Sequence, residues 1–212
     1  GWLTAASALA REGRADAAPH LIYVPERPVT VDAILADIER VVRRLGMAVV
    51  AVSEGIRDAA GHFLAASSAA VDAFGHQQLG GVSAYLADQV TRGIGLKARF
   101  EKPDTMQRAS TCLISAVDAQ EAYEVGAAAV RAMLAGQTAQ MVTIVREPGV
   151  AYQAHTGLVP LAQVANRERR LPEAYMAGPE EGVTDAFLDY ARPLIGPVLP
   201  EHGRLARYPL GK

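Results

Sequence analysis

One carboxylate in this sequence follows a strand-like segment at a point where ligands are commonly bound. Residues 47–53 form a short, valine-rich apolar run between Gly46 and Gly55, which is typical of a strand buried on both faces of a parallel sheet. Glu54 is the first ionisable side chain beyond this run, where open parallel sheets bind their ligands. A carboxylate there can accept hydrogen bonds from a polyhydroxylated ligand or transfer a proton. An ordinary solvated loop residue is the alternative interpretation.

Two arginines could bind a phosphate group. Arg99 and Arg108 flank the polar cluster 104–107, and a guanidinium can bind phosphate oxygens bidentately without losing its charge. The alternative is that they pair with Glu101 or Asp104 on a solvated surface.

Other kinds of site are not indicated. The five histidines are scattered, with no pair at the spacing of helical metal ligands, so no metal site is predicted within this chain. Ser110 and Cys112 belong to no nucleophile motif, and no catalytic residue is assigned among them. The glycine-rich residues 74–81 match neither the dinucleotide-binding nor the P-loop spacing, which favours a glycine-permitted turn.

The elements that must position these residues alternate between helix and strand. A helix is predicted over 2–12. The strand over 20–24, a helix from the N-cap Thr30 to Gly46 and the strand over 47–53 then form a parallel crossover unit. The remaining pattern predicts a long loop over 56–78, helices over 80–93, 118–134 and 183–192, a strand over 96–101 and a buried strand over 140–145. The fold class is α/β.

The composition is that of a globular protein. The 212 residues carry 21 Lys and Arg against 23 Asp and Glu, a formal charge of −2 that gives no reason to expect binding to nucleic acid or to an acidic membrane. Charged residues interrupt the apolar stretches well before the roughly 18 residues of a membrane-spanning helix. A single cysteine excludes an internal disulfide, which favours a cytoplasmic location.

Several short segments together resemble the phosphofructokinases, most closely their pyrophosphate-dependent branch. The segments are Val-Ser-Glu-Gly-Ile at 52–56, Phe-Gly-His-Gln-Gln-Leu-Gly-Gly-Val at 74–82, Met-Gln-Arg at 106–108 and Pro-Leu-Ala-Gln-Val-Ala-Asn-Arg-Glu at 160–168. The resemblance extends from Gly1 to about Met176. It implies a Rossmann-like parallel sheet with flanking helices, and a homodimer or larger assembly. It also implies transfer of a phosphoryl group from pyrophosphate to the 1-hydroxyl of fructose 6-phosphate, a reversible step of glycolysis, with Mg²⁺.

The resemblance also assigns substrate-binding residues. Glu54 matches a glutamate that hydrogen-bonds the fructose hydroxyls. The four residues Thr105, Met106, Gln107 and Arg108 match a sugar-phosphate motif that ends in an arginine on the 6-phosphate, although the family usually has Tyr where this chain has Thr105. Arg99 is similar in spacing to a second phosphate-binding arginine that reaches across a subunit interface in ATP-dependent relatives.

The resemblance further implies that part of the site lies outside this sequence. The donor-binding glycine loop, the catalytic aspartate and the Mg²⁺ ligand are expected upstream of Gly1, so this chain resembles a carboxyl-terminal half and is expected to be inactive alone. We expect a sugar-phosphate-binding region over 1–146, with 56–110 as a candidate part of the donor-side domain, and a loop-rich extension over 147–212 with one or two helices. An ATP-dependent phosphofructokinase, a kinase for another acceptor and a non-catalytic sugar-phosphate-binding subunit are the alternatives.

Overall fold

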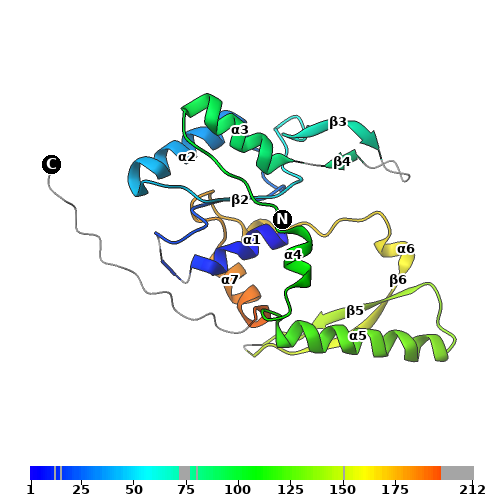
Figure 1. The fold of residues 1–212 in the computed structure, drawn as a ribbon. Coiled ribbons are helices and arrows are strands. Elements are labelled where there is room, and N and C mark those ends of the chain that lie inside the picture. Colours follow the sequence, from blue (N-terminus) through cyan, green and yellow to red (C-terminus); the bar gives the residue numbers. More distant parts are fainter. Residues whose placement is uncertain (12, 15, 72–76, 80, 150, 197–212) are drawn as a thin grey trace. The chain divides into compact units, whose positions relative to one another are not determined.

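The computed structural model describes residues 1–11, 13–14, 16–71, 77–79, 81–149 and 151–196; at 66–71, 77–79, 106 and 107 it describes the backbone only. The chain forms two compact units. Unit 1 comprises Gly1–Gln107 and Gln163–Pro193, and unit 2 comprises Arg108–Ala162 and Leu194–Lys212. Figure 1 labels α1 to α7 and β2 to β6.

The centre of unit 1 is the predicted strand, helix, strand unit. β1 (Leu21–Tyr23) and β2 (Val50–Val52) pair in parallel, and α2 (Val31–Leu45) connects them. Leu21 lies opposite Val50 in the register of the two strands. A Rossmann-like parallel arrangement with flanking helices is therefore confirmed.

Both predicted ends of α2 are also confirmed. The Thr30 side-chain oxygen accepts a hydrogen bond from the amide of Ala33 at 3.2 Å, which satisfies one of the free donors at the helix start. Gly46 follows the last turn with φ of 79°, a conformation that glycine adopts without strain.

β1 is fully buried and separates two apolar clusters, because successive side chains of a strand point to opposite faces. The first cluster contains Leu21, Tyr23, Ile34, Ile38, Val41, Ile56, Val82, Leu86 and Val90. The second contains Ala5, Ala8, Ile22, Val24, Leu171, Met176, Val183, Phe187 and Ala191. The core of unit 1 is thus built around a strand of only three residues.

Helices on either side of β1 supply these clusters. α2 and α3 (Val82–Ile94) contribute to the first, and α1 (Trp2–Ala6), the 3₁₀ turn Ser7–Arg11 and α7 (Asp185–Ala191) to the second. The helices predicted over 2–12, 80–93 and 183–192 are therefore confirmed. Trp2, Tyr175, Phe187 and Tyr190 form an aromatic group with ring centroids 5.4 to 6.3 Å apart.

A late segment of the chain, residues 171–183, covers the second edge of β1, and we call it the strap. The amide of Ile22 donates a hydrogen bond to the carbonyl oxygen of Pro179 at 2.8 Å. A Cβ added to Gly182 would lie 2.6 Å from Cδ1 of Ile22, so the strap backbone approaches the strand closely. β1 therefore has hydrogen-bond partners on both edges, as a buried strand requires.

Charged side chains tie the strap to α2. Nε of Arg40 and Nη2 of Arg44 donate to the two carboxylate oxygens of Glu180 at 2.9 and 2.8 Å. Arg40 also donates to Asp37, whose other oxygen accepts the hydroxyl hydrogen bond of Tyr23 at 2.8 Å. The network connects β1, α2 and the strap.

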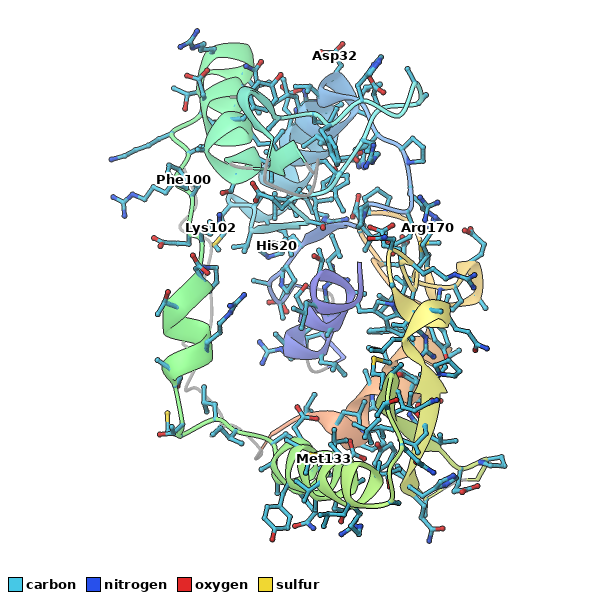
Figure 2. All side chains as sticks on the ribbon, turned by 90° about the vertical axis from the view of Figure 1, so that its right-hand side faces the viewer. His20, Asp32, Phe100, Lys102, Met133 and Arg170 are labelled. Carbon is cyan, nitrogen blue, oxygen red and sulfur yellow. The ribbon has the colours of Figure 1, made fainter. Side chains whose placement is uncertain are left out.

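A buried histidine fixes the residues that precede the two strands. Nδ1 of His20 accepts a hydrogen bond from the amide of Val49 at 2.9 Å, and Nε2 lies 3.3 Å from the carbonyl oxygen of Asp16. Figure 2 labels His20 within unit 1. Since both ring nitrogens have protein partners, this histidine has a structural role.

The prediction that the strand over 47–53 is buried on both faces is wrong. β2 is half-buried and shorter than predicted, and Met47 and Val49 are 50% and 41% exposed. The physical reason is that, within the described part of the chain, β2 pairs along one edge only, so fewer neighbours cover its side chains.

Two further elements of unit 1 differ from the prediction. The predicted loop over 56–78 contains β3 (Ala66–Val71) and the start of β4 (Gln77–Leu79), and the two strands pair antiparallel. The prediction missed β3 because a run of alanine and serine conceals the alternation of a strand. Residues 96–101 form no strand. Their alternation is real, since Leu96 and Ala98 pack against the first cluster, but no strand lies beside them among the described residues.

Unit 2 consists mainly of a helix packed on a hairpin. α5 (Ala116–Leu134) contacts β5 (Gln140–Arg146) and β6 (Ala154–Pro160), which pair antiparallel. α5 begins earlier than predicted, because the Ser115 hydroxyl, rather than Asp118, is the N-cap. The remaining short elements of the chain are the 3₁₀ turn Glu173–Tyr175 in unit 1, and α4 (Asp104–Ala109), α6 (Leu161–Val164) and the 3₁₀ turn Arg192–Leu194, which cross the boundaries between the units.

The hairpin differs from the prediction in burial and in extent. β5 is a strand as predicted, but it is largely exposed rather than buried, because it has α5 on one face and only one partner strand among the described residues. β6 was not predicted. Since β5 and β6 pair across residue 147, the compact units do not follow the expected division into 1–146 and 147–212.

A search of the described residues found no helix long and apolar enough to cross a membrane.

The Glu180 network makes a prediction about pH. Hydrogen bonds from Arg40 and Arg44 hold the pKa of Glu180 below its usual range, so its carboxylate stabilises the fold above the unfolded pKa of about 4.3, and this contribution is lost as the pH falls through the folded pKa. We expect Glu180→Gln to lower the Tm at pH 7, and the difference from the wild type to shrink below about pH 4.

Thermal unfolding between pH 7 and pH 3 measures this difference. Glu168→Gln is the control, because Glu168 is exposed and its carboxylate lies 3.8 Å from Nε of Arg170, too far for a hydrogen bond. A Tm difference for Glu180→Gln that does not depend on pH would contradict the prediction.

Candidate functional site

The carboxyl ends of β1 and β2 place two loops side by side. The strands are parallel, so residues 24–29 and 53–57 leave the sheet at the same edge. The amide of Val29 donates to the carbonyl oxygen of Arg57 at 3.0 Å, and a Cβ added to Gly55 would lie 3.7 Å from Cβ of Pro25. The two loops therefore support each other at the edge where open α/β sheets bind ligands.

Glu54 lies between the end of β2 and the start of α3. Its side chain is half-buried, and its Oε1 lies 3.5 Å from the amide nitrogen of Val82, the first residue of α3. Gly81 precedes the helix with φ of 88°. A carboxylate is stabilised at a helix N-terminus, where backbone donors and the helix dipole favour negative charge. The predicted position of Glu54 beyond the strand is therefore confirmed, while its role as a sugar ligand stays a prediction.

The residues that follow Glu54 form an ordered turn instead of a featureless loop. Oδ1 of Asp58 accepts hydrogen bonds from the amides of Ala60 at 2.9 Å and His62 at 2.8 Å, and the bond from His62 lowers the pKa of Asp58. The Arg57 guanidinium lies 3.7 Å from the ring centroid of Phe63. Local side-chain hydrogen bonds of this kind define the turn.

The other predicted ligands lie on α4 and on the segment before it. Arg99 is exposed on the extended segment after α3, where Figure 2 shows the side chains of Phe100 and Lys102. Thr105 and Arg108 are exposed on α4.

The side chains of Met106 and Gln107 lie outside the described part of the structure, as do residues 74–76 and 80 of the predicted glycine turn, while 77–79 belong to β4 rather than to a turn. The boundary between the units falls between Gln107 and Arg108, so Glu54, Arg99 and Thr105 belong to unit 1 and Arg108 to unit 2. A common sugar-phosphate site formed by Glu54 and Arg108 therefore stays a prediction.

Sequence reasoning missed two residues at the same sheet edge. Oε1 of Glu26 accepts a hydrogen bond from the amide of Leu171 at 2.9 Å, and its side chain is 9% exposed. Nη1 of Arg27 donates to the carbonyl oxygen of Ala177 at 2.6 Å. A signal for them exists in the sequence, because they follow β1 just as Glu54 follows β2, and parallel strands end at the same edge.

These side chains are suited to binding a polar, anionic ligand. The Glu54 carboxylate can accept hydrogen bonds from hydroxyl groups, and exposed guanidiniums can bind phosphate. In the part of the chain that the structure describes, no group of three or more His, Cys, Asp or Glu side chains could hold a metal ion.

Comparison with known proteins extends these observations. Residues 1–133 match the model of the phosphofructokinase family. A pyrophosphate–fructose 6-phosphate 1-phosphotransferase of Xanthomonas campestris pv. campestris (strain B100) is 41% identical over 195 residues, which are 92% of this chain and 46% of the relative. A sulfofructose kinase of Alkalicoccus urumqiensis is 33% identical over 177 residues, 83% of this chain and 45% of the relative.

A solved structure shows the same likeness in three dimensions. The crystal structure of a pyrophosphate-dependent phosphofructokinase from Marinobacter aquaeolei has a TM-score of 0.73 and 33% sequence identity, covering 96% of this chain and 47% of that one.

The fold thus defines an α/β protein with polar side chains at the carboxyl ends of its parallel strands, where open α/β sheets bind ligands. The chain belongs to the phosphofructokinase family, as its sequence motifs predict. It spans about half the length of the curated relatives it matches.

Proposed function

We propose that the complete gene product containing this chain transfers a phosphoryl group from pyrophosphate to the 1-hydroxyl of fructose 6-phosphate, giving fructose 1,6-bisphosphate and phosphate. This chain supplies contacts to the sugar phosphate and, on its own, shows no turnover. The names of the relatives support this reaction, since both the Xanthomonas protein and the Marinobacter structure are described as pyrophosphate-dependent.

The observation that carries the proposal is the placement of Glu54. Its carboxylate lies at the sheet edge, 3.5 Å from the first amide of α3, and is half-buried. A half-buried carboxylate held in this way can accept hydrogen bonds from two neighbouring hydroxyls of a sugar. This role requires orientation and not proton transfer, so Glu54 is proposed as a substrate ligand and not as the catalytic base.

Arginines complete the proposed binding of the substrate. Arg108, with Thr105, Met106 and Gln107, is proposed to bind the 6-phosphate, because a guanidinium matches two phosphate oxygens in one plane. Arg99 is proposed to bind the 6-phosphate of the sugar held by a neighbouring subunit, in a homodimer or larger assembly. Its side chain is exposed and therefore accessible for that contact.

Three further properties belong to the proposal by family resemblance. They are a requirement for Mg²⁺, a role in reversible glycolysis and a cytoplasmic location. No residue of this chain is assigned to Mg²⁺, because the resemblance places its ligand upstream of Gly1, and no step is derived through the ion.

A second candidate reaction changes the acceptor. The sulfofructose kinase relative is 33% identical to this chain, so a sulfonated sugar is the alternative acceptor substrate to fructose 6-phosphate. A sulfonate carries one negative charge where a phosphate carries nearly two, and paired arginines therefore favour the phosphate.

Turnover assays on the complete gene product test the proposal. Pyrophosphate and ATP are each supplied with fructose 6-phosphate or 6-deoxy-6-sulfofructose, in the presence of Mg²⁺. We expect fructose 1,6-bisphosphate from pyrophosphate and fructose 6-phosphate, and far less product from the other combinations. Turnover with ATP but not with pyrophosphate would indicate an ATP-dependent phosphofructokinase, and faster turnover of the sulfonated sugar would indicate a sulfofructose kinase. Binding of fructose 6-phosphate without turnover would indicate a non-catalytic sugar-phosphate-binding subunit.

The proposed role of Arg108 predicts a selective loss of affinity. Arg108→Ala removes a charge-assisted contact of about 2–3 kcal/mol, so the KM for fructose 6-phosphate is expected to rise roughly 30- to 150-fold. Steady-state kinetics of the complete protein measures the change. Arg131→Ala, which removes another exposed arginine of unit 2, is the control. An unchanged KM would exclude Arg108 as a phosphate ligand.

The proposed role of Glu54 predicts an effect on the same substrate. Glu54→Gln keeps the shape of the side chain and removes its charge, so the KM for fructose 6-phosphate is expected to rise about tenfold while the KM for pyrophosphate stays unchanged. Glu101→Gln, at an exposed position, is the control. Equal changes in both KM values would contradict a role limited to the sugar.

A further inference from the structure

The loop after β1 is held by the strap, far along the sequence. Oε1 of Glu26 accepts a hydrogen bond from the amide of Leu171, and Leu171 is itself 2% exposed. The neighbouring Arg27 binds the strap a few residues further on. Two consecutive side chains of one loop therefore fix the first half of the strap.

Arg27 makes several of these contacts at once. Its Nη1 donates to the carbonyl oxygen of Ala177 at 2.6 Å. Its Nη2 donates to the carboxylate of Glu173 and lies 3.4 Å from the carbonyl oxygen of Met176. A planar guanidinium can bind three acceptors in a fixed geometry, which a lysine ammonium at the same position cannot reproduce. Arg27 thus sets both the distance and the direction of the strap relative to the loop.

The same loop contacts the residues on both sides of Glu54. The amide of Ser53 donates to the carbonyl oxygen of Tyr23 at 3.1 Å, and the amide of Val29 donates to that of Arg57 at 3.0 Å. Pro25 packs against Gly55. A shift of residues 24–29 would therefore shift residues 53–57, and with them the Glu54 carboxylate at the start of α3.

We propose that Arg27 is a positioning residue for Glu54: by anchoring the strap, it fixes the loop after β1 and so holds the Glu54 carboxylate in place for the sugar. This inference rests on the proposed function, because it uses Glu54 as the sugar ligand. It adds a residue that does not contact the substrate but decides how well a contacting residue is aimed.

The strap also has an independent anchor that serves as a control. Arg44, near the end of α2, binds Glu180. In a strand, helix, strand unit the connecting helix runs back along the strands, so the end of α2 lies toward the edge of the sheet opposite Glu54. Arg44→Ala therefore weakens the strap without disturbing the loops at the carboxyl edge.

The experiment compares Arg27→Ala, Arg27→Lys and Arg44→Ala in the complete gene product. Hydrogen–deuterium exchange of peptides spanning 52–57 reports the order of the Glu54 loop, and steady-state kinetics reports the KM for each substrate. For Arg27→Ala we expect faster exchange in 52–57 and about a tenfold higher KM for fructose 6-phosphate, with an unchanged KM for pyrophosphate. Arg27→Lys restores these values only in part, and Arg44→Ala changes neither.

Three results of this comparison would contradict a positioning role for Arg27, and a fourth would contradict the proposed function. Unchanged exchange in 52–57 for Arg27→Ala would overturn the inference, and so would faster exchange with an unchanged KM for fructose 6-phosphate. Equal effects of Arg27→Ala and Arg44→Ala would show that both arginines merely stabilise the fold, which also overturns it. A wild-type protein without turnover on fructose 6-phosphate and pyrophosphate would overturn the proposed function, and this inference with it.

Discussion

The burial of β1 is the constraint on which the rest of unit 1 depends. Both faces of this short strand are covered by apolar clusters, and a buried backbone must find hydrogen-bond partners on both edges. β2 supplies them on one edge and the strap on the other. Because the strap comes from residues 171–183, the carboxyl-terminal part of unit 1 completes the sheet begun by its amino-terminal part.

The candidate site is a consequence of this arrangement. Parallel pairing brings the carboxyl ends of β1 and β2 to the same edge of the sheet. Glu26, Arg27 and Glu54, which follow these strands, therefore lie at that edge. Glu54 is fixed by α3, whereas Glu26 and Arg27 are occupied by the strap. Side chains at equivalent places after two neighbouring strands thus differ in role, because one set satisfies the backbone of a packed segment and the other remains open to a ligand.

The predictable parts of the fold are those whose signals are local. Thr30 and Gly46 mark the ends of α2, a periodic apolar pattern marks α3, and a short continuous apolar run marks β1. Several predictions failed where a segment becomes a strand only through its pairing partner. Residues 96–101 alternate but have no strand beside them in the described structure, and β6 becomes a strand because β5 pairs with it. α5 begins before the predicted residue 118, because the Ser115 hydroxyl accepts a hydrogen bond from the amide of Asp118 and so caps the helix.

The sequence alone determined the family, the parallel crossover and the position of Glu54 after a strand, because each depends on residues close together in the chain. Only the tertiary structure decided which segment covers β1, since the hydrogen bond from Ile22 to Pro179 and the contacts of Arg27 join residues that no local pattern relates. It also decided that Glu54 lies against the first amide of α3. The physical reason is that short-range propensities set the elements, whereas the pairing of buried polar groups sets how the elements meet.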